Sequence, residues 1–148
     1  MIKLSQRDPQ WATVKLGKSS LTVGRYGCTT TCISMLTSYF GCYRTPPDIA
    51  KILQKYTPDG LVLWSTLDVP CMKFVGRIYT RMDSEIDASL KDPDKAVILN
   101  VANGSHWVVA IKRVPLTSTY LIADPWDGRV KLSTAYRNIT GSAHYIRK

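Results

Sequence analysis

The sequence predicts an α+β fold in which N-terminal helices pack on one face of a C-terminal antiparallel sheet. In the first half of the chain, apolar residues recur at spacings of three and four, as in helices, whereas short β-branched and aromatic runs follow from Ala96 onward. No repeat or linker divides the 148 residues, and 45% of them are hydrophobic, enough for one core. We therefore expect a single domain over residues 1–148, with a cleft where the two halves meet.

Three helices are expected. The first covers residues 28–40, whose apolar side chains form one helical stripe. The second covers residues 45–56, where Thr45 can cap the first turn and Pro46 fits the first helical position. A third, shorter helix begins after Asp83. The expected strands, separated by turn residues, are 96–101, 106–113, 118–124, 129–133 and 143–148.

The chain is strongly basic. Its net charge of +9 and pI near 9.5 favour an anionic partner such as a bacterial cell wall or an anionic membrane face. Lys and Arg never form a run longer than two and accompany no nucleic-acid motif, so nucleic-acid binding is not indicated. There is no run of roughly 18 apolar residues to span a membrane, and the N-terminus lacks the apolar core of a signal peptide. We expect a monomer made in the cytosol.

Four cysteines, Cys28, Cys32, Cys42 and Cys71, are expected to be free thiols, because cytosolic cysteines usually stay reduced. They include no CxxC pair, and the chain has only two histidines as further ligands, so no structural metal is expected. Nothing in the sequence indicates a cofactor.

Cys28 differs from the other cysteines in its position. It follows Gly27 and opens the first helix, where unpaired amides and the helix dipole favour the thiolate. The glycine permits a tight turn that leaves room for a substrate beside the sulfur. The other three cysteines are expected to fill space. Cys28 is therefore the candidate nucleophile.

A nucleophilic cysteine needs a base, and His106 is the better candidate. If residues 106–113 pair with residues 117–124 in a hairpin, His106 lies opposite Asp124, about 5 Å away. A carboxylate at that distance can hold the imidazole in the required tautomer. His144 has no acidic residue near it in the sequence, and we interpret it as a surface or sheet histidine.

The chain resembles the bacteriocin-leader-peptidase-like branch of the papain-like cysteine peptidases, which includes versions found in bacteriophage genomes. The similar segments occur in the family's order and span Gln6 to Gly128: SQRDPQW, LGKSSLTV, YGCTTTCISMLTSYFG, GLVLW, SHWVVAIK and YLIADPWDG. The resemblance implies a papain-like fold.

The same resemblance implies roles for individual residues. Cys28 would be the nucleophile, His106 the general base, Asp124 the residue that orients the base, and Gln6 a donor to the oxyanion. Gln10 is the alternative to Gln6.

The tryptophans nearest these residues are candidates for substrate binding. Trp107 and Trp126 each lie within two residues of a proposed catalytic residue, although large aromatic side chains most often belong to the core.

The leading hypothesis is a cysteine hydrolase that cleaves peptide or amide bonds. Small size, basic charge and the family resemblance suggest a phage endolysin that cuts the peptide crosslinks of peptidoglycan after release to the cell wall during host lysis. The alternatives are an intracellular protein-processing protease and a catalytically dead module that binds a peptide or an anionic polymer.

Overall fold

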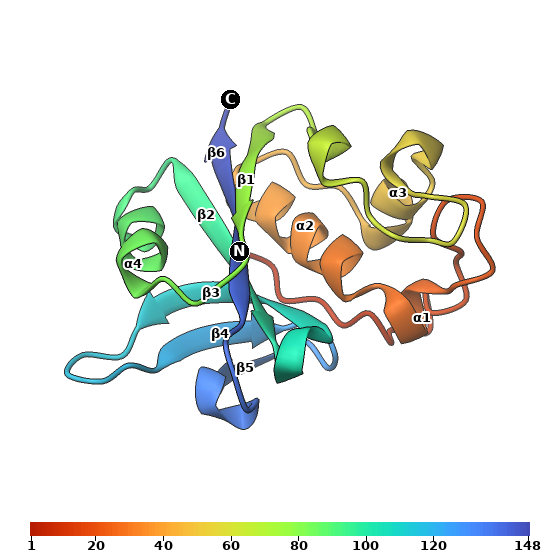
Figure 1. Cartoon of the computed structure of the whole chain (residues 1–148). Coiled ribbons are helices and arrows are strands. Elements are labelled where there is room, and N and C mark those ends of the chain that lie inside the picture. Colours follow the sequence, from red (N-terminus) through yellow and green to blue (C-terminus); the bar gives the residue numbers. More distant parts are fainter.

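The computed structural model describes the whole chain, residues 1–148, and has the α+β architecture predicted from the sequence (Figure 1). The α-helices are α1 (Val23–Tyr26), α2 (Cys28–Tyr39), α3 (Pro46–Ala50) and α4 (Asp83–Lys91). Short 3-10 helices are η1 (Leu53–Lys55), η2 (Trp64–Thr66), η3 (Ala102–Gly104) and η4 (Ser133–Ala135). The strands are β1 (Met72–Ile78), β2 (Lys95–Val101), β3 (His106–Arg113), β4 (Tyr120–Asp124), β5 (Arg129–Leu132) and β6 (Gly141–Arg147). None of the helices combines the length and the apolar character that crossing a bilayer requires.

The strands form one six-stranded sheet in the order β1-β6-β2-β3-β4-β5, with every neighbouring pair antiparallel. The last strand, β6, therefore lies between β1 and β2. The first strand was not predicted from the sequence. Its pattern is interrupted where its pairing with β6 shifts between Phe74 and Gly76, and this bulge breaks the alternation by which a strand is recognised.

Helices cover both faces of the sheet, rather than the one face expected. On one face α2 packs against β3 within a core cluster of 22 buried residues. On the other face α4 packs against β2 and β3 above a second cluster of nine buried residues. Strand β2 is consequently buried on both faces from Ala96 to Val101.

The second predicted helix is shorter than expected. Thr45 and Asp48 form a capping box at the start of α3, as the cap prediction requires, but the helix ends at Ala50. Beyond it, Lys55 is buried and its ammonium group donates to the carbonyl oxygens of Thr66 and Asp68. The apolar spacing in the sequence does not reveal this tertiary contact. Here the chain forms a 3-10 turn, η1, in place of further α-helix.

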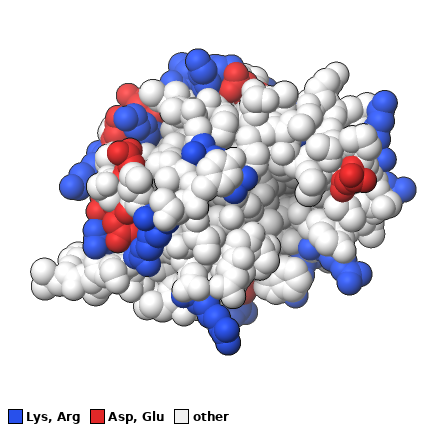
Figure 2. Space-filling view, viewed as in Figure 1, with Lys and Arg blue, Asp and Glu red and all other residues white.

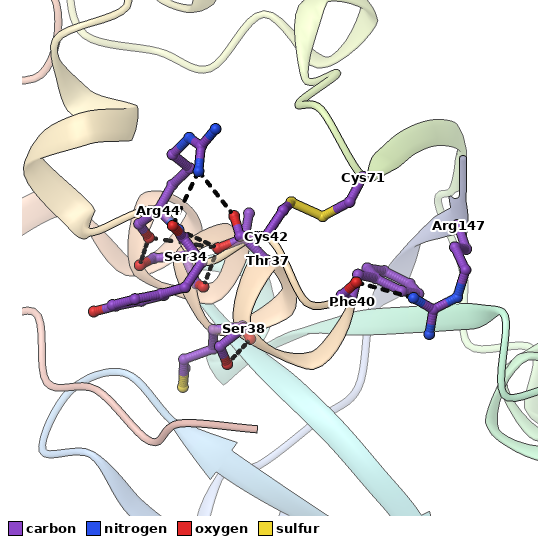
Figure 3. The surroundings of a disulfide bond; sticks show 10 residues. Ser34, Thr37, Ser38, Phe40, Cys42, Arg44, Cys71 and Arg147 are labelled. Carbon is purple, nitrogen blue, oxygen red and sulfur yellow. Dashed lines mark hydrogen bonds between the residues drawn. A yellow bond between two sulfur atoms is a disulfide. The ribbon is translucent and has the colours of Figure 1, made fainter.

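The expectation of four free thiols is wrong for two of them. Cys42, just after α2, forms a disulfide with Cys71, just before β1, across a sequence separation of 29 residues (Figure 3). Cys28 and Cys32 are free. The fold brings the Cα atoms of the pair to 5.9 Å from each other. Sequence spacing alone does not reveal this proximity, because β1, whose pairing places Cys71, was not predicted.

Candidate active site

The candidate nucleophile, Cys28, is the first residue of α2, beside the free amide groups of the helix start. Gly27 joins α1 directly to α2. A Cβ atom at Gly27 would lie 2.5 Å from the carbonyl oxygen of Val23, which is closer than two such atoms can approach. The glycine is therefore needed for backbone packing at the point where the chain enters α2.

The candidate base and acid lie together on neighbouring strands. His106 opens β3, and its Nε2 lies 2.8 Å from Oδ1 of Asp124 at the end of β4. The predicted register between β3 and β4 is wrong by two residues, because Val109 lies opposite Ala123. The turn that joins the two strands is longer than expected, and a bulge in β3 offsets part of the resulting shift in register. Side chains alternate with a period of two, so this slip keeps His106 and Asp124 on one face as diagonal neighbours.

The carboxylate of Asp124 is fully buried and accepts hydrogen bonds from four donors. On Oδ1 these are His106 Nε2 at 2.8 Å and the backbone N–H of Trp126 at 2.9 Å. On Oδ2 they are Lys131 Nζ at 2.8 Å and the hydroxyl of Tyr136. Neither Lys131 nor Tyr136 was predicted. The Asp124 to Gly128 turn was a usable signal for Lys131, because it folds β5 back along β4.

These contacts shift the pKa values of all three groups. Burial raises the pKa of the Asp124 carboxyl, but its hydrogen-bond donors outweigh burial and hold it well below its usual range. Burial lowers the pKa of His106, but hydrogen bonds to Asp124 and Cys28 raise it to about 9. Burial also raises the pKa of the Cys28 thiol, whereas the hydrogen bond to His106 and the charge of its ring bring it below its ordinary value. The site thus favours a thiolate beside an imidazolium.

The turn that leads into His106 has a strained backbone. Ala102 and Asn103 have φ values of 53° and 56°, in the left-handed region that side-chain-bearing residues seldom adopt. Two hydrogen bonds hold the turn: Ser105 Oγ donates to the Ala102 carbonyl oxygen at 2.7 Å, and Asn138 Nδ2 donates to Asn103 Oδ1 at 2.9 Å. Strain of this kind is typical of functional sites, where it fixes a side chain in position.

A comparison with protein families gives a match to the Peptidase C39 family over residues 18–136. This chain belongs to the peptidase C39 family. It is therefore a cysteine peptidase, an enzyme that acts on peptide substrates, with a papain-like α+β fold. The matched range contains Cys28, His106 and Asp124 and begins after Gln6. No curated protein and no solved structure matches the chain.

In this C39 peptidase the two candidate oxyanion donors have different positions. Gln6 is buried, lines the same hollow as Cys28 and His106, and donates one Nε2 hydrogen to the Gly24 carbonyl oxygen at 3.2 Å. Its second amide hydrogen has no partner. Gln10 is exposed and does not line this hollow. The structure thus places Gln6, and not Gln10, in the hollow that contains Cys28.

Two adjoining hollows form the cleft of the peptidase. The first, of about 390 Å³, contains Cys28, His106 and Trp126 in its lining. The second, of about 440 Å³, is lined by Thr29 and Trp107, and both hollows share Tyr26. Figure 2 shows one face of the molecule hollowed between the helices on one side and the sheet on the other.

The two tryptophans singled out from the sequence differ in exposure. Trp126 is 41% exposed, and the guanidinium of Arg7 lies 4.2 Å from the centre of its ring. Trp107 is 8% exposed and packs against Trp64 with ring centres 5.0 Å apart. Trp126 therefore presents a ring to the cleft, whereas Trp107 contributes mainly to its floor and to the core.

The other free thiol, Cys32, and the other histidine, His144, are not part of the candidate active site. Cys32 is fully buried, its thiol donates to the Trp107 carbonyl oxygen at 3.4 Å, and burial raises its pKa well above the ordinary value. His144 lies on β6, and its two ring nitrogens bond Ser89 and Ser142, each at 2.8 Å. Nowhere does the fold gather three His, Cys, Asp or Glu side chains in a metal-binding group.

Proposed function

We propose that Cys28, His106 and Asp124 form the catalytic triad of this peptidase. The observation that carries the proposal is that Asp124 bonds Nε2 of His106 at 2.8 Å while His106 and Cys28 line the same hollow. The imidazole also lowers the pKa of the Cys28 thiol. Asp124 fixes the tautomer and the orientation of the ring and stabilises the imidazolium. The low pKa of Cys28 supplies the thiolate.

The reaction follows from these positions. The Cys28 thiolate attacks the scissile carbonyl carbon, and the tetrahedral intermediate collapses as the C–N bond breaks and His106 gives its proton to the departing amine. Water then attacks the thioester with His106 as base, which releases the acid and restores the thiolate. No cofactor or metal enters either step.

Two donors would stabilise the oxyanion: the backbone N–H of Cys28 at the start of α2 and the free amide hydrogen of Gln6. The buried, anchored position of Gln6 supports this role. A donor aimed at the developing charge contributes about 3 to 4 kcal/mol to the barrier reduction. In Gln6→Ala, kcat should therefore fall by about two orders of magnitude, whereas Gln10→Ala should match the wild type.

For the substrate we propose the peptide crosslinks of bacterial peptidoglycan, cut by a bacteriophage-type endolysin. The net charge of +9 supports an anionic wall as the surroundings. The Cys42–Cys71 disulfide supports a place of action where disulfides persist, outside a reducing cytosol.

Digestion of purified peptidoglycan, with products identified by mass spectrometry, tests the proposal. Wild type should release peptide fragments with new amino and carboxyl ends, and Cys28→Ser should lower the rate by about a thousandfold or more. A parallel digest uses an unfolded protein as substrate. If the unfolded protein is cleaved while the peptidoglycan stays intact, this result would contradict the wall assignment and favour protein processing. Equal rates for wild type and Cys28→Ser would contradict the assigned nucleophile.

A further inference from the structure

Arg77, on β1, is a cation inside the cleft without a conventional partner. Its side chain is half-buried, makes no hydrogen bond or ion pair, and its Nε is buried with no acceptor in reach. Three aromatic rings surround it instead: its guanidinium carbon lies 5.0 Å from the ring centres of Trp64 and Trp107 and 4.4 Å from that of Tyr79.

Aromatic rings attract a cation, but they do not replace the acceptors that a guanidinium loses when it leaves water. The five N–H donors of an arginine form a rigid planar fork that fits a carboxylate. Here that fork is held among rings, its Nε is buried, and none of its donors has an acceptor within the protein. Its environment is therefore suited to a carboxylate that arrives from outside.

The position of Arg77 relates this fork to catalysis. It lines the second hollow together with Thr29, the residue that follows Cys28, and Tyr26, which that hollow shares with the first. The lining of this hollow includes no Asp or Glu, so the chain offers Arg77 no carboxylate of its own there. A peptide bound across Cys28 would place a neighbouring residue over this hollow.

We propose that Arg77 anchors a substrate subsite that binds a carboxylate carried by the peptide close to the scissile bond. The proposal rests on the proposed function only in taking Cys28 as the nucleophile. Either an acidic side chain or a free α-carboxylate supplies the same planar anion, which the fork binds through two parallel hydrogen bonds.

Ligand binding tests the subsite without catalysis. The probes are N-acetyl-glutamate amide, which carries a side-chain carboxylate, N-acetyl-glutamine, which carries an α-carboxylate, and the neutral N-acetyl-glutamine amide. Because Trp64 and Trp107 flank Arg77, binding should change tryptophan fluorescence. At least one carboxylate probe should bind about tenfold more tightly than the neutral one. Which of the two binds identifies the source of the carboxylate.

Three variants complete the binding test. Arg77→Met keeps an apolar stem among the rings and should abolish the preference for carboxylate, whereas Arg77→Lys should retain part of it. Lys73→Met is the matched control, because Lys73 lies exposed on the same strand without a salt bridge and its replacement removes the same charge. The subsite is refuted if wild type shows no preference, or if Arg77→Met keeps it.

Kinetics provide the second measurement. A peptide library with Glu or Gln at each position should show one position at which wild type prefers Glu in kcat/KM, mainly through KM. That ratio should fall to about one in Arg77→Met and persist in Lys73→Met. An unchanged ratio in Arg77→Met contradicts the subsite. The Cys28→Ser variant measures the proposed nucleophile separately, so a failure of one proposal is distinguished from a failure of the other.

Discussion

In the proposed mechanism, catalysis by a thiolate and an imidazolium depends on pH through two residues, Cys28 and His106. The pKa of Cys28 is lowered and that of His106 is raised to about 9, so both groups are charged in the range between the two values. We expect kcat/KM to follow a bell-shaped pH profile. Its acid limb appears as pH falls and Cys28 takes up a proton, and its alkaline limb near pH 9 as His106 loses one.

The acid limb has an independent measurement in the alkylation of Cys28 by iodoacetamide. The rate should stay high to a lower pH than for an ordinary cysteine, because only the thiolate reacts and the pKa of Cys28 is lowered. Cys32 should remain unmodified in the folded protein, because it is fully buried and its pKa is raised. Alkylation of Cys28 with the pH dependence of an ordinary cysteine thiol would contradict the assigned ion pair.

We predict that Lys131 influences the proposed triad through Asp124. Its ammonium lies 2.8 Å from Oδ2 of Asp124 and places a positive charge near His106 that disfavours the imidazolium. In Lys131→Met we expect the pKa of His106 to rise and the alkaline limb of the pH profile to move to higher pH. Unfolding free energy should fall by about 1–3 kcal/mol, because a buried carboxylate loses a partner.

The control for Lys131→Met is Lys112→Met, which removes the same charge from an exposed residue with no ion pair. Its profile should match the wild type. An alkaline limb that moves to lower pH in Lys131→Met would show that the lysine acts on the triad in some other way.

Among individual residues, the sequence indicates the candidate site residues of types that are rare in the chain and misses those of common types. Cys28 and His106 stand out because the chain has few cysteines and histidines. Asp124 follows from the predicted hairpin, because a register error of two residues leaves its side chain on the same face as His106. Lys131 and Tyr136 are ordinary until β5 and the segment after η4 fold over Asp124. Their roles depend on tertiary structure.

A methyl group added at Gly27, where α1 meets α2, should affect both stability and activity. In Gly27→Ala, the new Cβ would conflict with the backbone of Val23, so α1 or the start of α2 must move. We expect a loss of about 1–3 kcal/mol of unfolding free energy and a lower kcat, because Cys28 moves with the helix start. Chemical denaturation and steady-state kinetics measure the two effects.

The control is Gly76→Ala, where an added Cβ has no atom within 4 Å and φ is not positive. Its stability should stay within about 0.5 kcal/mol of the wild type. If both alanine variants behave alike, close packing at Gly27 is not the reason for the glycine.

The disulfide connects two elements that shape the cleft. Cys42 and Cys71 close a loop that contains α3, η1 and η2, and this loop provides Gly60, Leu61 and Trp64 to the lining of the second hollow. A crosslink across 29 residues stabilises the fold by about 3–4 kcal/mol through the entropy of the unfolded chain. It also restrains this wall of the cleft.

Replacement of both cysteines by serine tests this contribution. We expect the Cys42→Ser/Cys71→Ser double variant to unfold at lower denaturant concentration than the oxidised wild type, with a loss of about 3 kcal/mol. A reductant should destabilise the wild type to a similar extent and leave the double variant unchanged. A wild type that is insensitive to reductant would contradict the crosslink.

Among the elements, the sequence predicts those whose own residues carry a clear helical or strand pattern. Helix α2 follows from the helical spacing of its apolar residues, and strands β2 to β6 follow from short β-branched and aromatic runs. Strand β1 was missed because a bulge breaks its period, and the second helix was predicted too long because the buried contacts of Lys55 override its local pattern. The disulfide depends on β1 and was missed with it.

Over the whole molecule the charge is unevenly distributed. Five of the 11 acidic residues fall within residues 83–94, on and after α4, whereas outside this segment 19 Lys and Arg accompany only six Asp and Glu. Figure 2 shows the acidic side chains concentrated on the α4 side, at the left, while basic side chains lie at several places around the hollowed face. Outside this segment the chain therefore carries a large excess of positive charge.

This asymmetry predicts that salt weakens the action of the enzyme on an anionic wall more than its action on a small peptide. The attraction between the basic surface and a polyanion acts over a Debye length of about 10 Å at 0.1 M salt and about 3 Å at 1 M. A short neutral peptide occupies only the cleft and gains little from it. Between low salt and 1 M we expect peptidoglycan cleavage to fall severalfold or more, while kcat/KM for a neutral peptide changes by less than about twofold. Equal salt dependence for the two substrates would show that the basic surface does not contribute to wall binding.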